Sequence, residues 1–293
     1  MASRRTESGP DGVVVIDKPA GWTSHDVVAK SRGVLGTRKV GHSGTLDPDA
    51  TGVLVLGIGR ATRLLRFLTE LPKSYVGEIV LGVETSTLDA AGEIVATHDM
   101  TGVVDDDVRA AAEALTGPIL QIPPMVSAVK IDGRRLHELA REGKEIDRPA
   151  RPVTVHRFEV EPIADRPGVW RCEVDCSSGT YVRTLAADVG TALGGGAHLG
   201  SLRRTAVGGF TLDDAGTIEA PVLLPMFAAV QHLAMVVVGA ETAIAVGHGR
   251  VLSTEALGAT GDGPWAVVDG DHTLLAVYQA HERGAKPSVV IPA

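Results

Sequence analysis

Cysteine and aromatic side chains are scarce in this chain of 293 residues, which contains two cysteines and 3% aromatic residues. Two cysteines cannot form a disulfide-dense secreted scaffold, so the sequence predicts reduced thiols and a cytoplasmic protein. The 35 glycines and 16 prolines follow no fixed period, which excludes collagen-like and repeat architectures. With 44% hydrophobic and 22% charged residues, the composition is that of an ordinary globular protein.

Long uncharged runs are also rare, and residues 222–240 form the one that approaches the length of a bilayer span. Pro225, Gln231 and His232 interrupt this run and argue against a membrane helix. Its first part has helical spacing and its last part resembles a strand. We therefore predict no membrane insertion, and a short helix that leads into a second domain.

Charge is unevenly distributed along the chain, although the net charge is −8. Residues 1–70 and 127–210 are net positive, whereas residues 71–126 and 211–293 are net negative. A local basic surface on an acidic protein can bind nucleic acid, because phosphate contacts act over about 8 Å. Scattered solvated charges explain the same counts equally well. The basic residues form three clusters: Arg60, Arg63 and Arg66; Arg134 and Arg135; Arg203 and Arg204.

Periodicity predicts more strands than helices, and several strands are adjacent in the sequence. This pattern favours an α+β fold with a mixed, largely antiparallel central sheet and flanking helices. We predict a flexible tail over residues 1–12, a first domain over 13–230, and a small β-rich domain over 231–293. Expected helices cover residues 24–36, with Ser24 as N-cap, and 60–71, 105–118, 134–143 and 180–195; expected strands cover 12–19, 53–59, 74–85, 92–98, 151–163 and 169–176.

The two cysteines lie in a run of alternating character, residues 169–176. Cys172 and Cys176 fall on the apolar side of this alternation, which is typical of a half-buried strand. No second pair of ligands accompanies them, so we predict buried structural thiols and no metal or redox site.

A polar loop bracketed by glycines, residues 41–52, is the strongest candidate for chemistry. A phosphate-binding P-loop needs a lysine after the last glycine, where this chain has Val53. A calcium loop that begins at Asp47 would need Glu at its twelfth position, which is Ile58. Two hypotheses stay open: an ordinary turn, whose residue types these are, and a catalytic carboxylate at Asp47.

A partner for such a carboxylate occurs in a distant glycine-containing segment, residues 177–190. If a helix begins near Thr180, Arg183 lies in its first turn, where the helix dipole disfavours a cation. A nearby Asp47 would offset that cost, and the guanidinium would lower the pKa of the carboxyl. The alternative is a surface arginine whose stem lies along the helix.

Six further segments follow one another along the chain: VVIDKPAGWTSHDVV (14–28), KVGHSGTLDPDATGVLVLGIGRATRL (39–64), KSYVGEIVLGVETSTLDAAGEI (73–94), PPMVSAVKIDGRRLHELAREG (123–143), CSSGTYVRTLAADVG (176–190) and GAHLGSLRRTAVGGF (196–210). Together and in this order they resemble the TruB family of tRNA pseudouridine synthases, in its actinobacterial form. One departure is Val126, where relatives often carry an aromatic residue.

The resemblance implies a pseudouridine synthase fold and a catalytic role for three residues. Asp47 would be the nucleophile, Arg183 would pair with it, and Tyr75 would pack on the target base. Tyr181 and Leu202 would complete the pocket. Tyr75 is also a candidate for removing a proton when the new bond forms.

Further positions are implied to have supporting roles. His42 would lie against the RNA near the extruded nucleotide. Asp89 and Arg141 would position the catalytic arginine. Lys18 would be a structural or phosphate contact, and Lys130 belongs, with Arg141, to a segment that closes over RNA in this family.

The implied substrate is the uridine at position 55 in the T loop of tRNA, which must leave the base stack before it reacts. The family needs no metal or organic cofactor, and we expect a monomer. Residues 231–293 resemble a PUA-like module, which either binds RNA or serves as a stabilising cap. Two other functions stay open: a non-catalytic protein that binds or remodels RNA, and a synthase that modifies another RNA.

Overall fold

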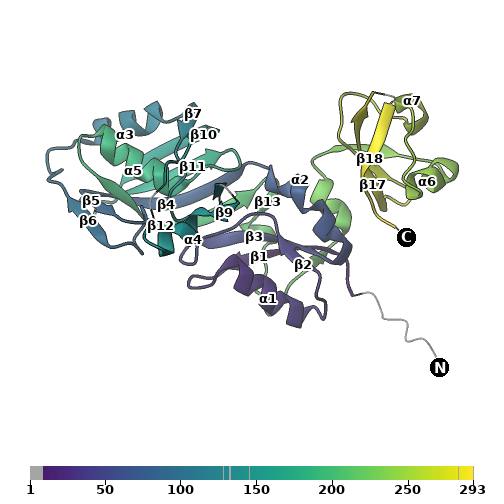
Figure 1. Cartoon of the computed structure of the whole chain (residues 1–293), viewed down its shortest axis with the longest axis horizontal. Coiled ribbons are helices and arrows are strands. Elements are labelled where there is room, and N and C mark those ends of the chain that lie inside the picture. The colour runs from purple at the N-terminus through teal and green to yellow at the C-terminus, as the bar shows by residue number, and fades with distance from the viewer. Residues whose placement is uncertain (1–8, 128, 132, 145, 283, 293) are drawn as a thin grey trace.

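Two large β-sheets organise the described part of the chain, one in the first domain and one at the C-terminus (Figure 1). Two small two-stranded sheets, β5-β6 and β8-β9, accompany them. The computed structural model describes residues 9–127, 129–131, 133–144, 146–282 and 284–292. Residues 1–8 of the predicted tail therefore lie outside the described part. The mixed α+β class with a large, mainly antiparallel sheet is confirmed, as is the separate C-terminal sheet.

The larger sheet contains ten strands within the described residues, in the order β14-β1-β3-β12-β4-β11-β10-β7, with β2 beside β3 and β13 beside β12. Its pairs are antiparallel except for β3 and β12. The strands are β1 (Gly12–Lys18), β2 (Val40–His42), β3 (Thr51–Ile58), β4 (Lys73–Leu81), β7 (Gly117–Gln121), β10 (Arg151–Pro162), β11 (Val169–Cys176), β12 (Ala197–Val207), β13 (Phe210–Thr211) and β14 (Leu223–Leu224).

Helices cover this sheet in two places. Helices α3 and α5 pack on the half that contains β10 and β12, whereas α1 packs against β2 at the other end. Cys172 and Cys176 are free and buried in the first of these layers, as the alternation predicts. The helices of this part are α1 (Ser24–Val34), η1 (Gly59–Leu64), α2 (Leu65–Thr69), α3 (Asp105–Ala114), α4 (Leu136–Arg141), α5 (Val182–Ala192) and η2 (Leu212–Asp214).

Two helix predictions differ from the structure at their starts. The N-cap of α1 is Thr23 and not Ser24, because Thr23 forms a capping box with Asp26. The predicted helix over residues 60–71 is divided into the 3-10 helix η1 and the short α-helix α2. Gly59, with a φ of 59°, turns the chain sharply out of β3 and into this tighter first turn.

Two further segments differ in detail from their predictions. The strand predicted over residues 74–85 is divided into β4 and β5 (Val83–Thr85). The second of these, β5, pairs with β6 (Ile94–Thr97). In residues 222–240, the short helix is the 3-10 helix η3 (Met226–Val230), which β15 (Ala234–Val237) follows. No helix in the described part of the chain is long and apolar enough to cross a membrane.

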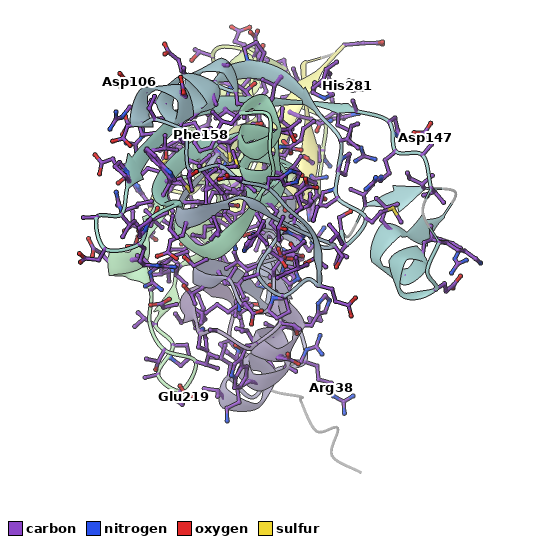
Figure 2. The ribbon with its side chains drawn as sticks, turned by 90° about the vertical axis from the view of Figure 1, so that its left-hand side faces the viewer. Arg38, Asp106, Asp147, Phe158, Glu219 and His281 are labelled. Carbon is purple, nitrogen blue, oxygen red and sulfur yellow. The ribbon has the colours of Figure 1, made fainter. Side chains whose placement is uncertain are left out.

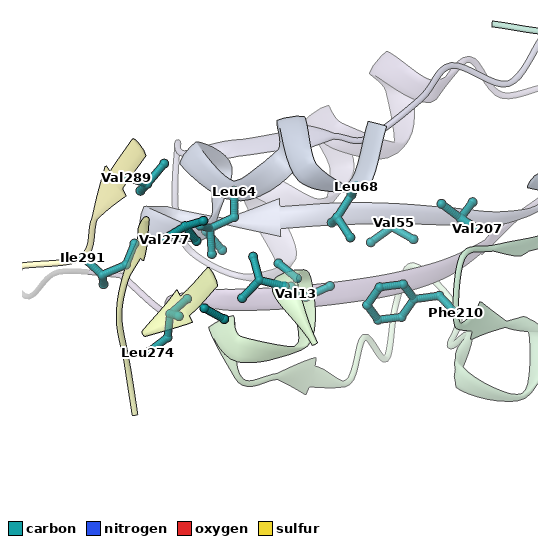
Figure 3. Packing of buried hydrophobic residues seen from close by; sticks show 14 of the residues in the cluster. Val13, Val55, Leu64, Leu68, Val207, Phe210, Leu274, Val277, Val289 and Ile291 are labelled. Carbon is teal, nitrogen blue, oxygen red and sulfur yellow. The ribbon is translucent and has the colours of Figure 1, made fainter. Parts of the chain in front are cut away.

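The C-terminal sheet has the order β15-β16-β17-β18, and β16 (Trp265–Val268), β17 (Leu274–His281) and β18 (Gly284–Val290) are antiparallel neighbours. Helices α6 (Ala240–Gly247) and α7 (Thr254–Leu257) belong to the same domain. Leu274, Val277 and Ile291 pack in one cluster with Val13 and Leu64 of the first domain (Figure 3). This shared core attaches the smaller domain to the larger one.

The first predicted basic cluster has a structural role at this junction. Arg63 donates to the carbonyl of Val290 at 2.6 Å, and Arg66 donates to that of Ser288 at 2.8 Å. Arg60 donates to the carbonyl of Pro292. These arginines, which we call the arginine clasp, bind main-chain carbonyls at the C-terminal strand, so this cluster has a structural role that its sequence does not indicate.

The second basic cluster lies on a projecting element that contains β8 (Lys130–Ile131), β9 (Arg134–Arg135) and α4. Asp147, just beyond it, lies at the margin of the molecule (Figure 2). Arg134 pairs there with Glu142. The side chains of Lys130 and Arg141, both predicted to act on RNA or on the site, lie outside the described part of the structure.

Candidate active site

The predicted catalytic loop runs from β2 to β3, and a buried lysine holds it. The Lys18 ammonium is fully buried and donates to the carbonyls of Pro19, Trp22 and Pro48 at 2.9, 2.6 and 2.8 Å. Burial lowers the pKa of Lys18 to about 8. Since three main-chain carbonyls engage this ammonium, its geometry is that of a structural support and not of a phosphate contact.

A second buried cation, Arg204, also holds the loop. Arg204 of β12 is 1% exposed and donates to the carbonyls of Val53, Gly44 and Thr45 at 2.7, 3.2 and 3.4 Å. Gly52 has a φ of 101°, and a Cβ there would lie 2.1 Å from the Arg204 carbonyl oxygen. Only glycine permits β3 and β12 to approach so closely at the end of the loop.

Asp47 and Arg183 meet at this loop as the sequence predicts. Arg183 lies in the first turn of α5, and its Nε is 3.1 Å from Oδ2 of Asp47. The arginine side chain is 5% exposed, whereas that of Asp47 is 44% exposed. The pair therefore presents its carboxylate, and not its cation, to an incoming substrate.

The other nitrogens of Arg183 are also occupied. Nη1 donates to the carbonyl of Thr87 and to Oδ2 of Asp89, each at 3.1 Å, and Nη2 donates to the carbonyl of Val126 at 2.9 Å. Asp89 in turn accepts from the Thr87 hydroxyl at 2.5 Å. The structure thus places Asp89 where it orients the arginine, as the resemblance implies.

The carboxylate of Asp47 opens into a hollow of about 260 Å³, which we call the first hollow. Tyr75, Tyr181 and Leu202 line it, together with Lys73. A second hollow of about 310 Å³ touches Asp47 and Arg183 as well, and is lined by Asp89 and Leu202. A carboxylate that reaches two hollows, one of them walled by two phenol rings, suits a planar base brought in from a polymer.

Burial sets the protonation of two groups in the first hollow. It raises the pKa of Asp47 above its ordinary value, while the Arg183 guanidinium acts in the opposite direction. The prediction of a lowered pKa is therefore wrong in its net direction, because desolvation of the carboxyl outweighs the ion pair with Arg183. Burial also raises the pKa of Tyr75, which keeps its hydroxyl neutral near pH 7.

His42 is not among the residues that line either hollow. Its ring makes an edge contact with His25, with the ring centroids 5.3 Å apart. Burial, followed by the charge of His25, lowers the pKa of His42. The structure therefore shows a half-buried, neutral imidazole beside another histidine, and the predicted contact with RNA stays a prediction.

Comparison with known proteins agrees with this geometry. A model of the TruB family pseudouridylate synthase N-terminal domain matches residues 32–182, and one of the tRNA pseudouridylate synthase B C-terminal domain matches residues 183–244. The chain belongs to the TruB family of pseudouridylate synthases.

Full-length relatives support the same family. The tRNA pseudouridine synthase B of Rhodococcus jostii (strain RHA1) is 50% identical, over 96% of this chain and 94% of that protein. The same-named protein of Arthrobacter sp. (strain FB24) is 45% identical, over 95% of this chain and 96% of that protein. The crystal structure of a Cbf5-Nop10-Gar1 complex contains a chain with a TM-score of 0.75 and 28% identity, which covers 96% of this chain and 85% of that one.

Three residues of this TruB family site are not found by reasoning from the sequence alone. Lys73 is 7% exposed in the first hollow and donates to two main-chain carbonyls, and burial lowers its pKa to about 8. Arg204 and Gln121 act through main-chain contacts to distant segments. Arg204 lies within β12, where a charged side chain inside a strand was an available signal, whereas Lys73 and Gln121 lie at strand ends and offered none.

No group of three or more His, Cys, Asp or Glu side chains in the described part of this TruB family chain is arranged to hold a metal ion. The polar side chains that line the first hollow are a carboxylate, phenols, cations and several serine and threonine hydroxyls.

Proposed function

We propose that this chain isomerises the uridine at position 55 in the T loop of tRNA to pseudouridine. The observation that carries the proposal is the Asp47–Arg183 ion pair at the edge of the first hollow. Relatives that share up to half of its residues over nearly the whole chain are named tRNA pseudouridine synthase B, which supports tRNA as the substrate.

The reaction exchanges one bond for another with no net gain or loss of atoms. The glycosidic bond between N1 of uracil and C1′ of ribose breaks, the base turns, and a bond forms between C5 and C1′. C5 then loses its proton, and N1 carries one in the product. An ionised carboxylate stabilises or captures the fragment formed when the first bond breaks, and we assign that role to Asp47.

The first hollow supplies the other requirements of this reaction. Extruding a base costs a few kcal/mol, and stacking on an aromatic ring returns about 1–3 kcal/mol per base. We assign that contact to Tyr75, with Tyr181 and Leu202 as the remaining walls. Burial raises the pKa of Tyr75, so its hydroxyl is protonated near neutral pH and has to pass on its own proton before it takes the one from C5.

Release of tritium from tRNA labelled at C5 of uridine tests the proposal, because the exchange of bonds must expel the atom on C5. The parent protein is compared with Asp47→Asn, which keeps the side-chain shape and removes the charge. We expect release by the parent and none by the variant. Equal release by both, or none by the parent, contradicts the catalytic assignment.

Two further results of this experiment would distinguish the alternative functions. Release from another RNA but not from tRNA would retain the chemistry and change the substrate. Binding of tRNA without release by the parent would favour a protein that only binds or remodels RNA.

We also propose that the protein acts as a monomer in the cytoplasm and that residues 231–293 form a PUA-like module. Two buried free thiols suit a reducing compartment. The arginine clasp and the shared core favour the stabilising-cap role of the module.

A further inference from the structure

The start of helix α5 lacks the side-chain cap that most helices have. Tyr181 is its N-cap residue, and no hydrogen bond from the Tyr181 side chain caps the first turn. The carbonyl of Tyr181 accepts from the amides of Thr184 and Leu185, as the first turn requires. Tyr181, Val182 and Arg183 at this start all line the first hollow, so a contact that fixes the first turn also fixes these residues at the site.

A glutamine from the edge strand β7 provides this support. The side-chain carbonyl of Gln121 accepts from the amide of Tyr181 at 2.8 Å, and its side-chain NH₂ donates to the carbonyl of Tyr181 at 3.1 Å. Gln121 is 3% exposed, so water does not compete for either bond. This two-point contact fixes the position and the orientation of the main chain two residues before Arg183.

The geometry of Arg183 makes its pairing with Asp47 sensitive to this anchor. The ion-pair contact with Asp47 comes from Nε, which is the guanidinium nitrogen closest to the main chain. The hydrogen bonds to Asp89 and Val126 come from the outer nitrogens. Because Nε has the shortest lever from the main chain, we expect a shift of the first turn of α5 to disturb the contact with Asp47 more than the outer hydrogen bonds.

From this arrangement we infer that Gln121 is a positioning residue of the reaction, which holds Arg183 Nε against Asp47 through the main chain of Tyr181. The inference rests on the proposed function, since it concerns the rate of the same isomerisation. Gln121 lines neither hollow, so it acts only through the helix.

The test compares Gln121→Met, which keeps the volume and removes both hydrogen bonds, with the parent. Single-turnover tritium release from labelled tRNA measures the chemical step, and filter binding measures the affinity for tRNA. We expect the chemical step to slow by about 10- to 100-fold, the loss typical of a reacting group displaced by about 1 Å, with affinity for tRNA unchanged. Leu120→Ala is the matched control, because Leu120 is the adjacent residue and is 74% exposed.

A double-mutant cycle shows whether the effect passes through the arginine. In an Arg183→Lys background the Nε contact no longer exists, so adding Gln121→Met should slow the reaction by less than about threefold. If the rate losses of Gln121→Met and Arg183→Lys are fully additive in the double variant, the inference is overturned. A Gln121→Met rate within about threefold of the parent also overturns it.

Thermal unfolding establishes that each variant is folded. If Gln121→Met is not folded, Gln121→Glu decides the question, because its carboxylate accepts from the Tyr181 amide and repels the Tyr181 carbonyl. A slower chemical step with unchanged affinity then supports the inference, and a rate equal to that of the parent overturns it. Absence of release by the parent itself would instead contradict the proposed function, so the two failures are distinguishable.

Discussion

Replacing Arg183 separates the two contributions that this side chain makes to the site, which are charge and shape. In the structure the three guanidinium nitrogens of Arg183 reach four acceptors. Arg183→Lys keeps the positive charge but leaves a single nitrogen in their place. Arg183→Met removes both the charge and the donors. A lysine ammonium is a point donor and cannot span acceptors that a planar guanidinium reaches together.

The expected magnitude follows from the number of bonds lost. Hydrogen bonds that involve a charged group contribute about 1.5–3 kcal/mol each, so losing two costs about 3 kcal/mol or more. At 1.36 kcal/mol for each factor of ten, Arg183→Lys should slow single-turnover tritium release by about 100-fold or more. Arg166→Lys is the control, because Arg166 forms a half-exposed surface pair with Glu78.

The pH dependence distinguishes the two variants. Arg183 lowers the pKa of Asp47 against the effect of burial, so removing its charge raises that pKa further. The active form of Asp47 is ionised, and the acid limb of the rate profile should therefore move to higher pH in Arg183→Met. It should keep its position in Arg183→Lys, which retains the cation. An Arg183→Lys rate within about threefold of the parent, or an acid limb of Arg183→Met that stays in place or moves to lower pH, would refute the reasoning.

Three other outcomes follow from the structure. Tyr75→Phe should keep its affinity for tRNA and slow tritium release if the hydroxyl takes part in proton removal, and undiminished release would eliminate that role. Lys18 has a pKa of about 8 in the folded protein and an ordinary pKa of 10.5. Between pH 8 and 10.5 the folded protein therefore binds fewer protons at this residue than the unfolded protein does. The free energy of unfolding should accordingly increase as the pH rises from about 8. In urea titrations Lys18→Met should lack this increase in the free energy of unfolding, which is about 3 kcal/mol at most. Identical pH profiles of stability for Lys18→Met and the parent would contradict the lowered pKa of Lys18. Replacing Arg63 and Arg66 by Ala should accelerate amide hydrogen exchange at the C-terminal strand while tritium release persists, and unchanged exchange would argue against the clasp.

Local pattern was sufficient to predict most of the fold. The alternation around Cys172 and Cys176 and the acidic start of the 105–118 segment depend on neighbours in the sequence, and the structure confirms both. The predicted glycine end of that helix is wrong, because α3 ends at Ala114 and Gly117 begins β7. The pairing of Asp47 with Arg183 was one of two hypotheses from the residues alone, and the resemblance to the TruB family selected it.

Features that depend on distant main chain were not predicted. The arginines at positions 60, 63 and 66 have the composition of a phosphate-binding cluster, and only the path of the C-terminal strand shows that they bind carbonyls. The direction of the pKa shift of Asp47 depends on how many atoms surround the carboxyl, which its sequence neighbours do not determine. Gln121 meets Tyr181 across 60 positions in the chain.

The arginine clasp also affects how the protein meets copies of itself. Strand β18 is the outer strand of its sheet, and an outer strand ordinarily offers a row of unsatisfied carbonyls to any extended polypeptide that approaches. Here guanidinium groups from the larger domain already cover the carbonyls of Ser288, Val290 and Pro292. Bulky, charged side chains at these carbonyls prevent a strand from another molecule from pairing with β18. The contacts that attach the small domain therefore also disfavour aggregation through this edge.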